Sequence, residues 1–159
     1  MYQLGSRSKQ RLVGVHPRLV AVVSRAIQLT TQDFTVLEGV RALSRQKELV
    51  AQGASQTMDS RHLKQPDGYG HAVDLAAYVD GQVAWDPWAR YVAIADAVRR
   101  AAIEQGTIVR WGGGWFQLND LASLQEVANA TKAYTDARRK AGRKAFPDGP
   151  HFELPAGVR

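Results

Sequence analysis

The first clear pattern along the chain is a helical one. In HPRLVAVVSRAIQLT, residues 16–30, apolar side chains recur at the spacing of one helix face, at Leu19, Val22, Val23, Ala26 and Ile27. FTVLEGV, residues 34–40, is rich in branched side chains and predicts a short strand. A second helix is expected over SRQKELVAQG, with Gly53 at its end.

The middle of the chain predicts a hairpin followed by a long helix. HAVDLAAYVDGQVAW, residues 71–85, has two strand-like halves joined at Asp80 and Gly81, which supply the positive φ angles of a tight turn. Asp86 and Pro87 suit the N-cap and first turn of the helix that follows, and Gly106 suits its end. Its expected buried stripe comprises Trp88, Tyr91, Val92, Ala95, Val98 and Ala102.

The last third predicts a strand, a helix and a closing strand. TIVRW, residues 107–111, is expected to be a strand that enters the glycines at 112–114. These glycines lack the spacing of a nucleotide-binding loop and are interpreted as a tight turn beside a site. A helix is expected from Asp120 to about Arg139, followed by a strand in PHFELP; the positions expected to face inward are Leu121, Leu124, Val127 and Ala128. This mixed order with hairpin-type connections predicts an α+β fold.

Composition narrows the class of protein. A chain of 159 residues, 45% apolar and 23% charged, predicts one globular domain over 1–159. No apolar run approaches the ~18 residues that span a bilayer, and the start MYQLGSRSKQRL lacks a signal-peptide pattern, so we expect synthesis in a cytoplasm and no stable membrane insertion. The chain has no cysteine, so any metal ion must be held by His, Asp or Glu.

The charge balance indicates an anionic partner. The formal net charge is +6 and the isoelectric point is about 9.9, which favours nucleic acid, a membrane surface or an acidic wall polymer. The basic run ARRKAGRK, residues 137–144, is interpreted as the solvated end of a helix in preference to a phosphate-binding patch. No nucleic-acid-binding motif is present and aromatic residues do not alternate with the basic ones, so we expect no nucleic-acid partner.

Candidate metal chemistry centres on SRHLKQPDGYGHAVDL, residues 60–75, which holds two of the four histidines. Because side chains alternate along a strand, His71 and Asp74 point to opposite faces of the expected sheet. This alternation favours His62 over His71 as the partner of Asp74.

A third ligand is expected from His151 in PDGPHFEL, because His16 lies near the first predicted helix without an acidic neighbour. Two histidines and one carboxylate suit a catalytic zinc that keeps one position open for water. Asp148, three residues before His151, either points toward that open position or is an ordinary turn aspartate.

Four segments in this order, EGVRALSRQKELVAQGASQTMDSRH, GHAVDL, IVRWGGGW and DGPHFEL, resemble a family of zinc peptidases. The family includes VanY-type D-alanyl-D-alanine carboxypeptidases and the L-alanyl-D-glutamate endopeptidases of phage lysis, and the match is closest to the phage endolysins. The match covers about residues 16–154, and the family pattern is SxHxxGxAxD followed later by [DE]xxH. The resemblance implies a small antiparallel sheet that carries the zinc site with helices packed around it, a Hedgehog/DD-peptidase-like α+β domain.

The resemblance also implies roles for individual residues. The implied Zn²⁺ ligands are His62, Asp74 and His151. Asp148 matches the acidic catalytic base, and Arg41, in EGVR, matches an arginine placed near the substrate carbonyl or carboxylate. His71 matches a position that is not a ligand, in agreement with the strand alternation.

Two features depart from the family pattern. Eleven residues separate His62 from Asp74, five more than usual, and we interpret the extra ones as a loop, since lengthening a loop costs little free energy. Asp67 or Tyr69 in this loop are alternatives for reaching the substrate. The long segment after Trp115, covering 116–145, is interpreted as an extra helix that borders the groove.

Trp111 and Trp115 are expected either to line the substrate cleft or to pack in the core.

The function implied by the resemblance is hydrolysis of the peptidoglycan stem peptide, with the bond between L-Ala and D-Glu as first choice. The alternatives are a D-Ala-D-Ala carboxypeptidase and a non-catalytic wall-binding domain. We expect a monomer without a separate cell-wall-binding module, which stays in the host cytoplasm until the membrane is permeabilised.

Overall fold

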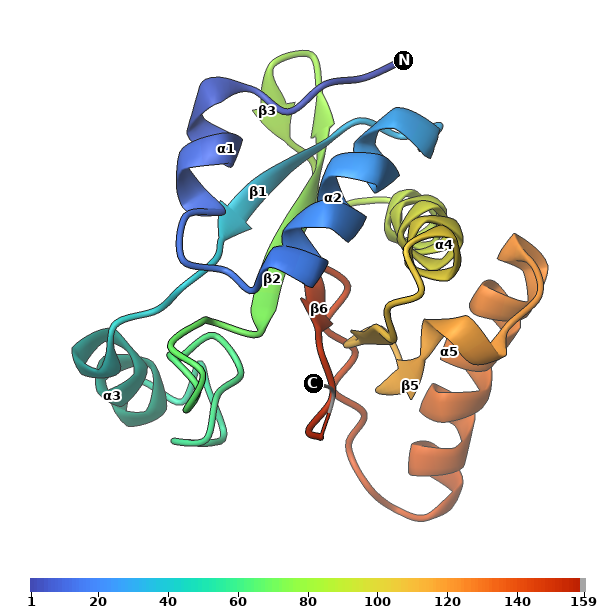
Figure 1. Ribbon diagram of the computed structural model, residues 1–159. Helices are drawn as coiled ribbons and strands as arrows, with labels where there is room; N and C mark the ends of the chain where they lie inside the picture. Colours follow the sequence, from blue (N-terminus) through green and yellow to red (C-terminus); the bar gives the residue numbers. More distant parts are fainter. Residues whose placement is uncertain (158–159) are drawn as a thin grey trace.

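A six-stranded sheet forms the centre of the computed structural model, which describes residues 1–157 (Figure 1). The strands lie in the order β1-β2-β6-β4-β5, and β3 pairs with β2 outside this path. The strands are β1 Phe34–Glu38, β2 Ala72–Val79, β3 Gln82–Val83, β4 Arg110–Trp111, β5 Phe116–Gln117 and β6 His151–Glu153. All strand pairs within the described residues are antiparallel, which confirms the predicted α+β class with a small antiparallel sheet.

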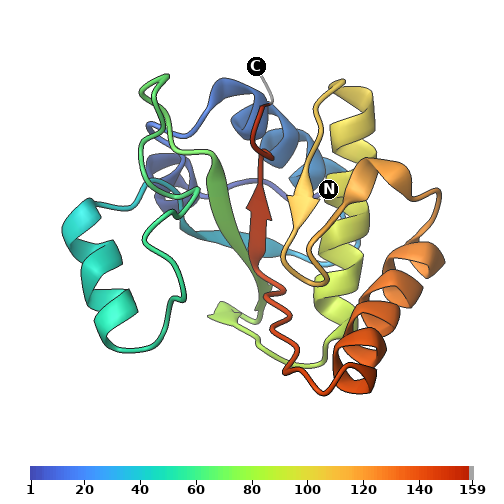
Figure 2. The ribbon, with the colours of Figure 1, turned by 90° about the horizontal axis from the view of Figure 1, so that it is seen from below.

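Helices surround this sheet. They are α1 Ser6–Arg11, α2 Pro17–Leu29, α3 Leu43–Ala51, α4 Ala89–Glu104 and α5 Leu124–Lys140, with a short 3₁₀ helix η1 at Leu118–Asp120. Helix α1 packs on β1 and was not expected from the sequence. Figure 2 shows α3 and α5 on opposite sides of the central strands β2 and β6. No helix within residues 1–157 has both the length and the apolar content needed to cross a bilayer.

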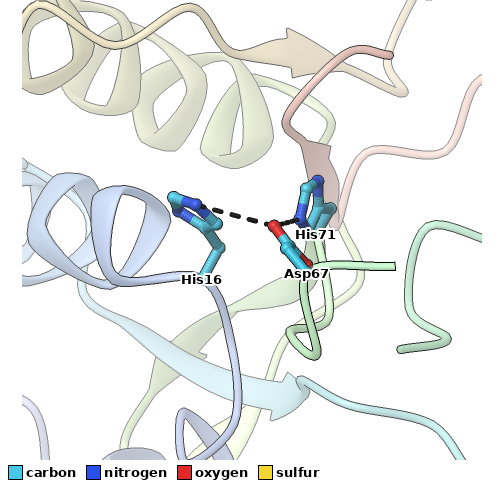
Figure 3. Close-up of side chains that lie close together, drawn as sticks. All are labelled: His16, Asp67 and His71. Atoms are coloured by element: carbon cyan, nitrogen blue, oxygen red, sulfur yellow. Dashed lines mark hydrogen bonds and ion pairs between the residues drawn. The ribbon is translucent and has the colours of Figure 1, made fainter. Parts of the chain in front are cut away.

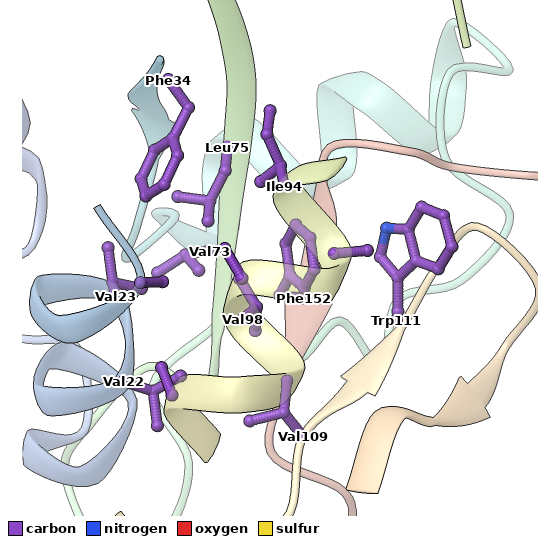
Figure 4. Packing of buried hydrophobic residues seen from close by; sticks show 14 of the residues in the cluster. Val22, Val23, Phe34, Val73, Leu75, Ile94, Val98, Val109, Trp111 and Phe152 are labelled. Atoms are coloured by element: carbon purple, nitrogen blue, oxygen red, sulfur yellow. The ribbon is translucent and has the colours of Figure 1, made fainter. Parts of the chain in front are cut away.

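The hydrophobic core lies where α2 and α4 pack together against one face of the sheet (Figure 4). All five apolar positions predicted for α2 are buried. Val73 and Leu75 of β2 are fully buried in this core, together with Phe152 of β6. Because side chains alternate along a strand, Asp74 and His151 point to the opposite, polar face of the sheet.

The predicted hairpin is confirmed. Asp80 and Gly81 join β2 to β3 with φ angles of 49° and 81°, the left-handed conformation that such a turn requires. Of the strand predicted over 107–111, only Arg110–Trp111 is a strand in the structure.

The predicted start of the long middle helix is wrong. Helix α4 begins at Ala89, so Asp86 and Pro87 precede it, and its N-cap Trp88 makes no side-chain capping bond. Trp88 is 36% exposed and does not belong to a fully buried stripe. The reason is its position ahead of the first turn, where its ring stacks at the edge of the core on Trp111.

The predicted start of the last helix is also wrong. Helix α5 begins at Leu124, and the hydroxyl of Ser123 accepts a hydrogen bond from the backbone N–H of Glu126 at 3.2 Å. The Glu126 carboxylate in turn accepts from the backbone N–H of Ala122, the residue before the N-cap, at 2.8 Å, which is a variant of the capping box. Leu124, in the first turn, is 46% exposed, whereas Val127 faces the core.

Candidate metal centre

Three residues singled out in the sequence meet on the polar face of the sheet. Asp74 and His151 are direct partners across β2 and β6, and His62 reaches them from the loop that follows α3. His62 Nε2 lies 3.2 Å from Asp74 Oδ1 and 3.2 Å from His151 Nδ1, and His151 Nδ1 lies 3.3 Å from Asp74 Oδ1. These three atoms are close enough together to hold one metal ion.

The hydrogen bonds behind the two imidazoles determine which nitrogens carry hydrogens. His62 Nδ1 lies 2.8 Å from the carbonyl oxygen of Gly39, which can only accept, so Nδ1 donates. His151 Nε2 lies 2.8 Å from Glu153 Oε2 and donates to that carboxylate. The other nitrogen of each ring, His62 Nε2 and His151 Nδ1, therefore faces Asp74, and when the ring is neutral that nitrogen carries the lone pair that a metal ion needs. Metal-ligating histidines show this pattern of a far N–H given to a carbonyl or carboxylate, so the residues fit a metal ion.

The charges in the group are strongly coupled. Burial alone would raise the pKa of Asp74, but hydrogen bonds from His151 and His62 hold it well below its usual range. Burial alone would lower the pKa of His151, but its bonds to Asp74 and Glu153 raise it to about 9. The site therefore favours positive charge between the two rings and the carboxylate.

Asp148 lies in the turn that leads into β6. Its backbone N–H donates to the carbonyl of Gly112 at 2.8 Å, and its own carbonyl accepts from the N–H of His151 at 3.2 Å. Asp148 stays accessible from the cleft, but surrounding protein atoms desolvate its carboxylate. This desolvation and the negative charge of Asp74 raise the pKa of Asp148. A raised pKa suits a carboxyl group that takes up and returns a proton.

Arg41 follows β1 and reaches the same group. Its guanidinium donates to both carboxylate oxygens of Glu38 at 2.7 Å and to the side-chain oxygen of Gln46 at 2.7 Å. Its Nη2 lies 3.9 Å from Asp74 Oδ2. The bonds to Glu38 raise the pKa of Arg41. The arginine is therefore a fixed positive charge beside the three candidate ligands.

The three glycines form a tight turn beside the site, as the sequence predicts. A Cβ on Gly112 would lie 2.6 Å from the carbonyl oxygen of Asp148 and 3.0 Å from the Cβ of His151. The N–H of Gly112 donates to the carbonyl of His151 at 2.8 Å. Glycine at this position lets the backbone approach closely enough to hold both residues in place.

A cleft of about 1320 Å³ opens above these residues. Arg45 and Leu49 of α3 line one side, and Tyr134 of α5 and Phe146 line the other, so the 116–145 segment does border the groove. Trp115 also lines the cleft, with its ring 5.5 Å from that of His151.

The two candidate tryptophans thus separate: Trp111 is fully buried in the core, and Trp115 belongs to the cleft.

A second group, of His16, Asp67 and His71, lies apart from the cleft (Figure 3). Asp67 Oδ2 is 2.6 Å from His71 Nε2 and 3.8 Å from His16 Nε2. The expectation that His16 has no acidic neighbour is therefore wrong, because the inserted loop folds back and brings Asp67 to it. Tyr69, whose ring lies 5.5 Å from that of His16, is held in the same place, so neither loop residue extends toward the substrate cleft.

The hydrogens in this second group are arranged the other way round. Arg61, whose guanidinium can only donate, places Nη2 2.8 Å from His71 Nδ1. The backbone N–H of Arg18 donates to His16 Nδ1 at 3.2 Å. In the neutral rings the hydrogens are therefore on the Nε2 atoms that face Asp67, which leaves no lone pair there for a metal ion. The contacts of this group, together with the backbone N–H of His16 that donates to the carbonyl of Gly70 at 2.9 Å, tie the inserted loop to the start of α2.

An open cleft that ends at a buried group able to hold a metal ion is a layout that suits a hydrolase. Comparisons with known proteins identify the family within this class. The family model described as phage L-alanyl-D-glutamate peptidase matches residues 1–155, and this chain belongs to that family.

Two relatives support the assignment. The L-alanyl-D-glutamate peptidase of Escherichia phage T5 is 29% identical over 156 residues, which cover 96% of this chain and 98% of that protein. The crystal structure of the Serratia marcescens L-Ala D-Glu endopeptidase ChiX superimposes with a TM-score of 0.71 at 40% identity, over 96% of this chain and 90% of that one.

Sequence reasoning missed Glu153 and Arg110, which lie next to the candidate ligands. Glu153 accepts from His151, and Arg110 Nη1 lies 3.2 Å from Glu153 Oε1. The alternation of β6 could have placed Glu153 on the same face as His151, two residues earlier. Nothing local in the sequence points to Arg110, because its contact depends on the pairing of β4 with β6.

Proposed function

We propose that this chain is a zinc-dependent peptidoglycan endopeptidase that hydrolyses the bond between L-Ala and D-Glu of the stem peptide. The observation that carries the proposal is the convergence of His62 Nε2, His151 Nδ1 and Asp74 Oδ1 at the floor of the cleft. The names of both relatives describe this bond, and the family membership supports the same reaction.

Zinc suits the donor set better than other common ions. Two imidazoles and one carboxylate, with no thiolate, form a frequent set of ligands in catalytic zinc sites. A zinc ion bound there would supply a Lewis acid and lower the pKa of a water molecule toward ~7. The proposed ligands His62, Asp74 and His151 would leave the fourth position open to the cleft.

Asp148 is the proposed general base. Its carboxylate takes the proton of the attacking water and later delivers it to the departing amine. The raised pKa of Asp148 supports this role, because a carboxyl group with a higher proton affinity takes up the proton more readily.

Arg41 is the proposed stabiliser of the developing oxyanion. Three of its five N–H groups are used by Glu38 and Gln46, which leaves one on each Nη atom for the substrate. An arginine already held in place by protein contacts loses little side-chain entropy when the substrate binds.

The dimensions of the cleft favour an endopeptidase over a D-Ala-D-Ala carboxypeptidase. A carboxypeptidase needs a pocket closed beyond the scissile bond, whereas this cleft exceeds the usual 300–1,000 Å³ of small-ligand pockets and runs between α3 and α5. The net charge of +6 suits a wall polymer rich in carboxylates. We propose that one monomeric domain over 1–159 acts on the wall once the host membrane has been permeabilised.

The test is mass spectrometry of peptidoglycan digested with zinc, after chelation, and with the His151→Ala variant. We expect stem peptides to be released in the zinc sample alone, leaving L-Ala with a free carboxylate on the glycan side. Release of terminal D-Ala would identify a carboxypeptidase. Absence of any zinc-dependent cleavage would refute the proposed reaction and favour a wall-binding domain.

A further inference from the structure

The polar face of the sheet continues beyond the candidate ligands. His151 and Glu153 are two residues apart on β6 and share this face, whereas Phe152 between them points into the core. Arg110 of β4 is the direct cross-strand partner of Glu153. The register of three strands therefore sets Asp74, His151, Glu153 and Arg110 side by side.

Both oxygens of Glu153 are used within this row. Oε2 accepts from His151 Nε2 at 2.8 Å, and Oε1 lies 3.2 Å from Arg110 Nη1. Glu153 is 7% exposed, so water cannot easily replace either partner. An oriented carboxylate of this kind holds the imidazole in one tautomer and one ring orientation. Here it directs His151 Nδ1 toward Asp74.

Arg110 is itself held in place by the cleft wall. Its Nε donates to the carbonyl oxygen of Trp115 at 3.3 Å, and its guanidinium lies 5.3 Å from the centre of the Trp115 ring. The Trp115 ring also packs against the ring of His151, so Trp115 contacts both Arg110 and the candidate ligand. The positive charge of Arg110 offsets the negative charge of Glu153. The pair would therefore add no net charge beside a bound metal ion.

We propose that Glu153 is a positioning residue for the metal centre, which fixes the tautomer and orientation of His151, and that Arg110 holds Glu153 for this role. The inference rests on the proposed zinc site and extends it by two residues. A purely structural role for the Glu153–Arg110 pair predicts lost stability without a specific loss of metal affinity.

The chain offers a matched control. Asp96 of α4 is also a buried carboxylate, 8% exposed, and its oxygen lies 2.8 Å from Arg99 Nη2. Its contacts lie within α4, and it takes no part in the row on the polar face. Asp96→Asn therefore measures what removing the charge of a buried, arginine-paired carboxylate does by itself.

The experiment measures zinc affinity of the metal-free protein by competition with a chromogenic chelator. Glu153→Gln keeps the size of the side chain, but its amide N–H₂ must face either His151 or Arg110, both of which donate. We expect zinc affinity to fall about 10- to 100-fold in Glu153→Gln and to stay within about twofold in Asp96→Asn. The visible spectrum of the Co²⁺-substituted protein is expected to change only in the Glu153 variant.

The outcomes separate this inference from the proposed function. If the unaltered protein binds no zinc, the metal centre itself is refuted. If it binds zinc and Glu153→Gln binds equally well, or if Asp96→Asn loses as much affinity, only the positioning role is refuted. If Glu153→Gln does not fold, Arg110→Gln is the second variant, since it leaves Glu153 in place. We expect it to lower zinc affinity by a smaller factor. An unchanged affinity in Arg110→Gln would refute the positioning role.

Discussion

Zinc binding to the metal-free protein is expected to release one proton, because His151 must give up the hydrogen on Nδ1 before that nitrogen can coordinate. The bonds of His151 to Asp74 and Glu153 raise its pKa to about 9. At pH 7, two units below that value, about 99% of the molecules carry the proton. Zinc binding should therefore release about one proton per ion.

The same argument predicts the pH dependence of affinity. A ligand whose pKa is raised in the metal-free protein competes with the metal at every pH below that pKa. The apparent affinity should therefore rise about tenfold per pH unit between pH 6.5 and 8 and level off above about 9. At lower pH a proton occupies His151 Nδ1 in place of the metal ion, so we expect zinc to dissociate first in the most acidic samples.

Isothermal titration calorimetry measures both quantities. Titrations in buffers with different protonation enthalpies give the number of protons released, and the binding curve gives the stoichiometry. We expect one zinc per chain, since the second group of His16, Asp67 and His71 has its Nδ1 atoms engaged by N–H donors. The matched control His16→Asn should behave like the unaltered protein. Zinc binding without proton release, or two zinc ions per chain, would contradict the reasoning about ring tautomers.

Further predictions concern the catalytic base, the core and the inserted loop. Asp148→Asn is expected to lower stem-peptide hydrolysis by about 10²- to 10⁴-fold with zinc affinity retained, because an amide cannot take the proton of water; steady-state kinetics and zinc titration check the two halves. Phe152→Ala should lower the free energy of unfolding in urea by about 3–5 kcal/mol, because the ring is fully buried and stacked on Trp111, and a loss below about 1 kcal/mol would show that the core is not packed as described. Burial and the neighbouring His71 lower the pKa of His16, so protonation favours the unfolded chain and stability should fall as pH drops below about 6.5. His16→Asn keeps a cap on α2 and should flatten this decline in thermal melts between pH 7 and 5; an unchanged slope would exclude His16 as its source.

Local patterns in the sequence were sufficient for most elements of the fold. The buried face of α2 and the turn at Asp80 and Gly81 follow from the spacing of apolar residues and from the φ angles that glycine permits. The alternation of β2 also separated Asp74 from His71 correctly. The ends of helices follow less directly from these patterns: α5 begins after the S-x-x-E signal at Ser123 and not at Asp120, and α4 begins after Pro87 and not at it.

The sequence by itself determined which residue types are available to hold a metal ion, because the absence of cysteine leaves histidine and carboxylates alone. Only the tertiary structure decided how they are grouped. His62 and Asp67 are five residues apart, yet one faces Asp74 in the cleft and the other faces His71 behind it. The physical reason is that periodicity is set by neighbours along the chain, whereas ring tautomers and strand partners are set by atoms that the fold brings from far away, such as Glu153 beside Arg110.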